Sequence, residues 1–108
     1  LNENIVRIFF MSGVRHYLGC NGEHCDKAIS VTRGDEIILR RELDNYFDTN
    51  AVQMLDVSGK LLGYVPRYYS EGVSQMLAGN KKISCHVYYV DSNKNCNECI
   101  KVILKYVP

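Results

Sequence analysis

One polar stretch decides the fold: Arg-Glu-Leu-Asp-Asn-Tyr-Phe-Asp-Thr-Asn-Ala-Val, at residues 41–52. It follows the apolar strand end Ile37-Ile38-Leu39, and a companion motif, Leu62-Gly63-Tyr64-Val65-Pro66, comes shortly after it. Asp and Asn side chains accept hydrogen bonds from nearby backbone amides and so favour tight, ordered turns. The stretch therefore predicts an ordered loop that displays the aromatic residues Tyr46 and Phe47. Such a loop is typical of a ligand-binding site, and equally of a turn that simply ends a strand.

Strand-like segments lie on both sides of this loop. They carry apolar runs or period-two alternation and are bounded by Gly, Ser, Asn or Asp, which predicts about six strands. Six segments are 5–11, 36–41, 51–57, 61–65, 83–90 and 98–107, and residues 14–18 resume extended character after the first of them. In the last of them we expect Ile100, Val102, Leu104 and Tyr106 to share one face, because side chains alternate along a strand.

One stretch has helical periodicity instead. Apolar residues at three- and four-residue spacing follow Pro66, and Gly79-Asn80 supplies a stop. This pattern predicts an amphipathic helix over residues 68–78, with a second short helix left open.

A chain of 108 residues with 46% hydrophobic residues is expected to fold as a single domain over residues 1–108. A meander of short strands in so small a domain predicts a mainly β fold, a small antiparallel β-barrel or a strongly curled sheet, because closure removes exposed strand edges. The formal net charge of +1 excludes a strongly basic protein that coats polyanions, but not a local basic patch. No apolar run is long enough to span a membrane, so we expect no membrane partner.

The five cysteines are an odd number, which argues against a complete internal disulfide framework. We expect Cys85 to be a buried thiol, and in the absence of a secretory signal we expect a reducing, cytoplasmic location. Two pairs, Cys20/Cys25 and Cys96/Cys99, have spacings that a tetrahedral zinc site uses, the first pair loosely. Unpaired thiols, a local disulfide and a structural zinc site all remain open, with unpaired thiols favoured and no cofactor expected.

The chain resembles the HIRAN domain family. The matching residues are Gly34-Asp35, Leu39-Arg40-Arg41-Glu42, Asp44-Asn45, Phe47-Asp48, Asn50-Ala51-Val52 and Leu62-Gly63-Tyr64-Val65-Pro66. They follow the family pattern G-D-x-L-x-L-x-R-E-P-x-N-P-Y-D-x-N-A-I, then G-Y-[IV]-P, then a helix. Leu43 and Tyr46 replace the usual prolines.

The resemblance implies an oligonucleotide-binding-like (OB-like) β-barrel with one or two accessory helices. It also implies recognition of single-stranded DNA, in well-understood members a 3′ end, by a non-catalytic module of helicase-like ATPases that remodel stalled replication forks in DNA repair. The chain begins at Leu1 rather than Met, which is expected of a fragment of a longer chain or of a trimmed product. Other domains of a longer chain are therefore among the expected partners.

The resemblance also implies a set of DNA-binding residues. Phe47 is the expected base platform, with His16 or Tyr17 facing it, and Asp48, helped by Asn45, is expected to accept a hydrogen bond from a terminal hydroxyl. A carboxylate there also repels a terminal phosphate. Arg15, Arg67 and Tyr64 are expected to meet backbone phosphates.

Each of these residues also has an ordinary structural role. Phe47 alone would more often fill a core, and Asp48 would cap a turn or a helix. Arg15 and Arg67 are ordinary surface charges, and Tyr64 and Tyr89 alternate in strands like core residues.

Two function classes therefore compete. A DNA-end-binding module is favoured by Asn45, Phe47 and Asp48, whereas a protein-interaction or structural barrel without nucleic-acid binding is favoured by near-neutral charge and by His16 in place of an aromatic residue. An enzyme is not expected, because no third carboxylate or lysine accompanies Asp44 and Asp48 in a nuclease-like order.

Overall fold

The computed structural model describes residues 5–14, 29–91 and 98–107. These residues form six strands and one helix, which confirms the predicted mainly β class. The elements are β1 (Ile5–Phe10), β2 (Ile38–Arg41), β3 (Val52–Leu55), β4 (Leu61–Tyr64), α2 (Arg67–Ala78), β5 (Ile83–Val90) and β6 (Ile100–Tyr106). Of the strand predicted over residues 14–18, only Val14 lies in the described part of the chain, and its side chain is buried.

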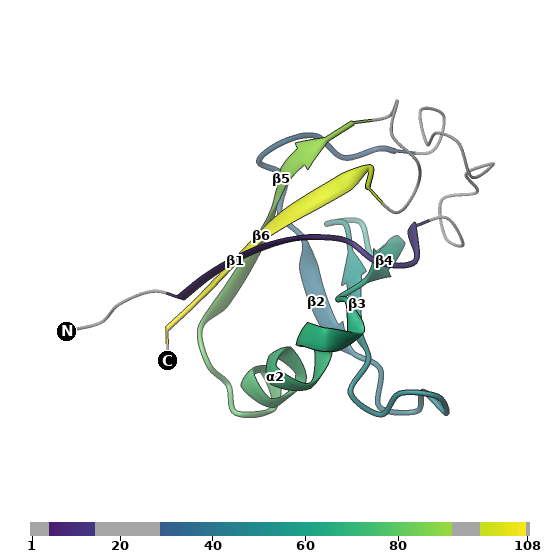
Figure 1. The fold of residues 1–108 in the computed structure, drawn as a ribbon, viewed down its shortest axis with the longest axis vertical. Helices are drawn as coiled ribbons and strands as arrows, with labels where there is room; N and C mark the ends of the chain where they lie inside the picture. Colours follow the sequence, from purple (N-terminus) through teal and green to yellow (C-terminus); the bar gives the residue numbers. More distant parts are fainter. Residues whose placement is uncertain (1–4, 15–28, 92–97, 108) are drawn as a thin grey trace.

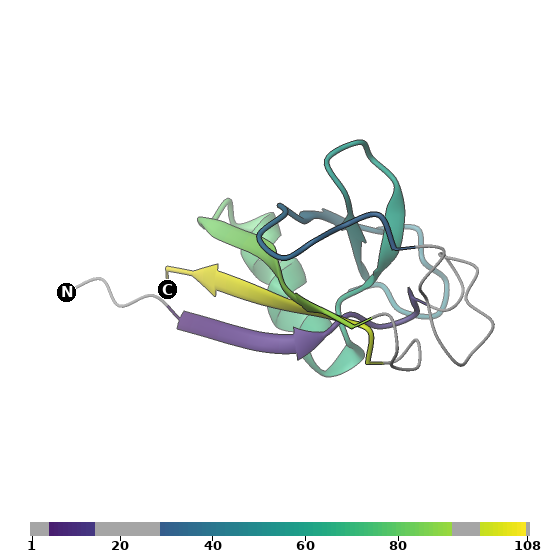
Figure 2. The ribbon, with the colours of Figure 1, turned by 90° about the horizontal axis from the view of Figure 1, so that it is seen from above.

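The strands pair in two antiparallel sheets of three strands each. One sheet has the order β1-β6-β5, and its strands run side by side in Figure 2. The other has the order β2-β3-β4, and α2 lies at one end of the two sheets (Figure 1).

Of the two expected forms, a closed barrel and a strongly curled sheet, the structure does not show the closed barrel, because no continuous ladder joins the two sheets in the described residues. Instead, two isolated antiparallel bridges connect them, Ser12 with Tyr64 and Glu36 with His86. The first bridge cannot grow into a ladder, because Gly13 turns the chain at a φ of 73° and Pro66 lacks the N–H that a longer ladder needs. The result is a pair of curled sheets joined at two edges rather than a barrel.

Gly63 makes the first of these bridges possible. The backbone N–H and C=O of Ser12 and Tyr64 exchange hydrogen bonds of 2.8 and 2.7 Å, which brings the two chain segments into close contact. A Cβ on Gly63 would lie 2.6 Å from the Ser12 carbonyl oxygen and 2.7 Å from Cγ of Met11. Only glycine therefore lets β4 approach the chain that follows β1.

The core lies between the sheets and follows the alternation that the sequence predicts. In β6, Ile100, Val102 and Leu104 are buried and Tyr106 is half-buried. Cys85 is buried in β5, as expected, and burial raises the pKa of its thiol to about 12. An inert core thiol is therefore its role.

Tyr89 departs from the predicted alternation. The β5–β6 register shifts between Val87 and Tyr89, which is a β-bulge. Tyr89 is consequently exposed and its hydroxyl donates to Asp91, whereas Val90 packs against the core. The expectation that Tyr89 is a core residue is wrong, because the extra residue of the bulge reverses the alternation, so that Val90 and not Tyr89 faces the core.

The helix covers Arg67–Ala78, directly after Pro66 and before Gly79, and so begins one residue earlier than the predicted 68–78. Its buried side includes two serines in addition to Val73. The Arg41 Nε donates to Oγ of Ser74 at 3.0 Å, which ties β2 to the helix. No helix of the described residues is both long and apolar enough to cross a membrane.

The close approach at Gly63 gives a test of the packing. We expect Gly63→Ala to lower the free energy of unfolding by about 1–3 kcal/mol, because the added Cβ meets a backbone oxygen that cannot move away independently. Gly72→Ala is the matched control: a Cβ there meets nothing within 4 Å, so the same methyl in a helix should stabilise by about 0.5–1 kcal/mol. Urea unfolding followed by circular dichroism measures both; equal effects of the two substitutions would contradict the packing argument.

Candidate functional site

The loop between β2 and β3 is held in shape by the side chain of Asn45. Its Oδ1 accepts hydrogen bonds from the backbone N–H of Phe47 at 2.9 Å and of Asp48 at 2.8 Å. Oδ1 of Asp48 in turn accepts from the N–H of Asn50 at 2.9 Å. These Asx-type bonds are those that the run of Asp and Asn predicts, and they fix the backbone on both sides of Phe47.

Asn45 is itself oriented by Glu42. The Asn45 amide donates through Nδ2 to Oε1 of Glu42 at 3.0 Å, which leaves Oδ1 facing the loop backbone. The other carboxylate oxygen, Oε2, accepts hydrogen bonds from the Tyr64 hydroxyl and from Nε2 of Gln53, the latter at 2.6 Å. Arg40 Nε donates to Oε1 of Gln53 at 2.8 Å and so fixes that amide as well. One carboxylate therefore connects β3, β4 and the loop.

These contacts keep Glu42 charged. The hydrogen bond from Tyr64 contributes most, and those from Gln53 and Asn45 add to it, so that together they lower the pKa of the Glu42 carboxyl from its usual 4.5 despite partial burial. A carboxylate that accepts several hydrogen bonds is stabilised in its ionised form.

Beside this network lies an open hollow of about 350 Å³. It sits where the loop, the end of β4, the start of α2 and the turn after β1 meet. Its lining residues are Ser12, Gly13, Glu42, Asn45, Phe47, Asp48, Ala51, Tyr64, Val65 and Arg67.

The structure brings together every predicted DNA-binding residue that it describes. Asn45, Phe47, Asp48, Tyr64 and Arg67 all line this one hollow. The other three candidates, Arg15, His16 and Tyr17, lie outside the described residues.

The exposure of these residues distinguishes their roles. Phe47 is 88% exposed, so it does not fill the core. Tyr64 is half-buried and its hydroxyl serves Glu42, so it is a structural residue of the hollow's wall. Asp48 is partly buried: one oxygen braces the loop through Asn50, and the other, Oδ2, lies 3.4 Å from the Ser70 hydroxyl of α2. Asp48 thus braces the loop and also borders the hollow.

Glu42 is the site residue that the sequence prediction missed. It looks like a surface charge after a strand, although the Glu42/Asn45 spacing of three residues was a usable signal for a mutual hydrogen bond. Its partners Gln53 and Tyr64 come from other strands, and only the fold brings them within reach.

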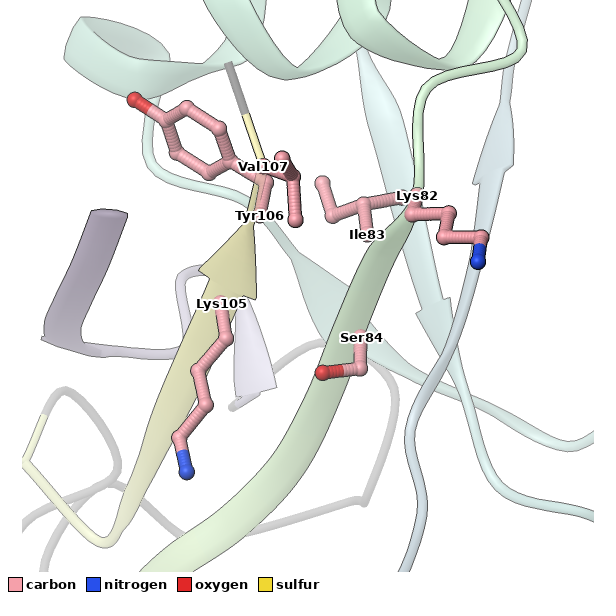
Figure 3. Close-up of a pocket in the computed structure, with 6 residues that line it drawn as sticks. All are labelled: Lys82, Ile83, Ser84, Lys105, Tyr106 and Val107. Atoms are coloured by element: carbon pink, nitrogen blue, oxygen red, sulfur yellow. The ribbon is translucent and has the colours of Figure 1, made fainter. Parts of the chain in front are cut away.

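A second hollow, of about 320 Å³, lies where β5 begins and β6 ends. Figure 3 shows that Lys82 and Lys105, its two cations, point in different directions, so they do not converge on one anion.

The cysteines do not assemble a metal centre in the described part of the chain, where no group of three or more His, Cys, Asp or Glu side chains is placed to hold an ion. Cys99 is buried, and burial raises the pKa of its thiol. Cys20, Cys25 and Cys96 lie outside the described residues, so the zinc hypothesis stays untested.

The lowered pKa of Glu42 gives a pH test of the network. Its stabilising effect is present above the unfolded-state value near 4.5 and is lost as the pH falls through the lower folded-state value. We therefore expect the difference in thermal unfolding temperature between the unmodified protein and Glu42→Gln to be largest near neutral pH and to shrink below about pH 4.5. Circular dichroism melts from pH 7 to 3 measure this.

Glu71→Gln on the exposed side of α2 is the control for charge removal alone. A Glu42→Gln difference that stays constant from pH 7 to 3 would contradict the role of the ionised carboxylate.

Three solved structures are similar to this chain in fold. A protein from Lactobacillus plantarum has a TM-score of 0.71 at 17% identity, over 99% of this chain and 98% of that chain. The HIRAN domain of human HLTF has a TM-score of 0.68 at 16% identity, over 94% of this chain and 74% of that chain. Its DNA-bound conformation has a TM-score of 0.57 at 16% identity, over 96% and 72%. At these identities the likeness shows the fold alone.

Sequence comparison gives the family directly. No curated protein matches the chain closely. The family model of the HIRAN domain matches residues 6–107, which include both sheets, α2 and the polar loop. This chain is therefore a member of the HIRAN domain family.

Proposed function

We propose that the hollow beside Phe47 binds a single-stranded DNA end, with a preference for a free 3′ hydroxyl. The observation that carries the proposal is the convergence on one hollow of Asn45, Phe47, Asp48 and Arg67, with Phe47 displayed on a backbone that side chains already hold in place. Membership of the family and the fold likeness to a HIRAN domain in its DNA-bound conformation support a DNA ligand.

Phe47 supplies the base platform. A ring that is 88% exposed has a free face, and stacking of one base on such a ring is worth about 1–3 kcal/mol. Because Asn45 binds the N–H groups of Phe47 and Asp48 in the free protein, little backbone order has to be gained on binding.

Asp48 supplies the preference for the end. Its Oδ1 is engaged with the Asn50 amide, and its Oδ2 faces Ser70 at a long 3.4 Å, which leaves accepting capacity for a ligand hydroxyl. A terminal 3′ hydroxyl donates to this carboxylate, whereas a 3′ phosphate adds negative charge beside it and is repelled.

Arg67 supplies a phosphate contact. It is exposed in the first turn of α2 and lines the same hollow. One arginine, with Arg15 as a second predicted contact, implies few neutralised phosphates and hence a shallow dependence of affinity on salt.

The protein-interaction alternative predicts a different result. It requires the exposed rings to meet a polypeptide, so DNA should not bind at micromolar protein, whatever its end. The expectations of no enzymatic activity and of a cytoplasmic location stay predictions.

The deciding experiment is fluorescence anisotropy with short single strands that end in a 3′ hydroxyl or a 3′ phosphate, at two salt concentrations. We expect tighter binding of the hydroxyl end. Asp48→Asn keeps an oxygen for the Asn50 amide but removes the charge, so it should weaken hydroxyl-end binding by about ten-fold and reduce the discrimination between the two ends.

Asp44→Asn is the matched control, because Asp44 is an exposed carboxylate of the same loop that does not line the hollow. Circular dichroism melts of both variants check that they fold. Equal binding of the two ends by the unmodified protein, or equal effects of the two substitutions, would overturn the end-recognition proposal.

A further inference from the structure

Tyr46 stands beside Phe47 and is even more exposed. The two side chains are 92% and 88% exposed, although aromatic rings usually bury much of their surface. Two adjacent exposed rings make a contiguous apolar surface of the kind that marks a binding site. The family pattern usually has a proline where this chain has Tyr46. The usual residues of the family therefore do not account for an aromatic ring at position 46.

The backbone carries Tyr46 between two anchored residues. Asn45 is fixed by Glu42, and the N–H that follows Tyr46, that of Phe47, donates to Asn45 Oδ1. The Tyr46 ring is therefore displayed on an ordered loop, as Phe47 is. Phe47 lines the hollow, whereas Tyr46 is not among its lining residues, which places Tyr46 just beyond the rim.

The two rings are nearly perpendicular. Their centroids are 5.6 Å apart and their planes meet at 82°, so the edge of one ring contacts the face of the other. A base that stacks flat on Phe47 therefore cannot also stack flat on Tyr46. Each ring needs a base of its own, and the two bases must lie in planes that differ by a similar angle.

We propose that Tyr46 is a second base platform, which stacks the nucleotide next to the terminal one. This rests on the proposed binding of a DNA end in the adjacent hollow. The angle between the rings then sets a requirement on the ligand: the strand turns sharply between its last two nucleotides. Stacked bases of a duplex lie parallel, so the last two nucleotides must both be unpaired.

The two rings thus select for an unpaired strand, in addition to the selection of a 3′ hydroxyl by Asp48. Phe47 and Asp48 hold the terminal nucleotide, and Tyr46 extends the contact to the penultimate one. A duplex whose 3′ overhang has only one unpaired nucleotide cannot satisfy both rings.

The test is a comparison of Tyr46→Ala and Tyr46→Phe with two probes in fluorescence anisotropy. One probe is a short 3′-hydroxyl single strand, and the other is the same strand with an abasic penultimate position. Tyr46→Ala should weaken binding of the intact strand by about ten-fold and leave binding of the abasic strand unchanged, since the base that it would stack is missing. Tyr46→Phe keeps the ring and should bind both probes within about two-fold of the unmodified protein.

Tyr88→Ala is the control for loss of an exposed tyrosine, because Tyr88 lies on β5 in the other sheet. Duplexes with 3′ overhangs of one and two nucleotides give an independent readout. The unmodified protein should prefer the longer overhang, and Tyr46→Ala should bind the two alike.

An equal loss on intact and abasic strands would assign Tyr46 a role in loop structure and overturn the proposal. Unchanged binding by Tyr46→Ala would also overturn it and assign the ring to another partner. Both outcomes differ from failure of the proposed function, in which the unmodified protein shows no preference for a 3′ hydroxyl and Asp48→Asn changes nothing.

Discussion

The structure of the site depends on one carboxylate. Glu42 accepts hydrogen bonds from Tyr64 on β4, Gln53 on β3 and Asn45 in the loop. These hydrogen bonds hold all three side chains in place. Because Glu42 accepts from Nδ2 of Asn45, the amide is oriented with Oδ1 towards the backbone N–H groups of Phe47 and Asp48. The exposure of two aromatic rings to water is unfavourable, and the hydrogen bonds of the network hold the loop in the conformation that displays them.

The bridge between Ser12 and Tyr64, which joins the two sheets, also helps to form the hollow. Gly63 lets β4 pair with Ser12, which brings Gly13 and Tyr64 to one place, and Pro66 then starts α2 so that Arg67 faces the same space. The bridge between the sheets is too short to close a barrel.

The sequence predicts local features well and non-local ones poorly. The strand alternation in β6, the helix between Pro66 and Gly79, and the Asx bonds of the loop all depend on residues close in the chain, and all were predicted correctly. The core assignment of Tyr89 was wrong because a bulge has no local signature in this strand. Glu42 was missed because its donors lie on β3 and β4, and the barrel was wrong because the number of bridging pairs between sheets depends on how the strands diverge in space.

The central claim is that the loop is ordered before any ligand binds. Amide hydrogen exchange at Phe47 and Asp48, measured by NMR in the ligand-free protein, tests it most directly. Because both N–H groups donate to Asn45 Oδ1, the account predicts slow exchange at these two positions although the Phe47 side chain is almost fully exposed. It also predicts that Glu42→Ala abolishes this protection while the amides of β6 remain protected. Exchange at the rate of an unstructured peptide in the unmodified protein would contradict the account.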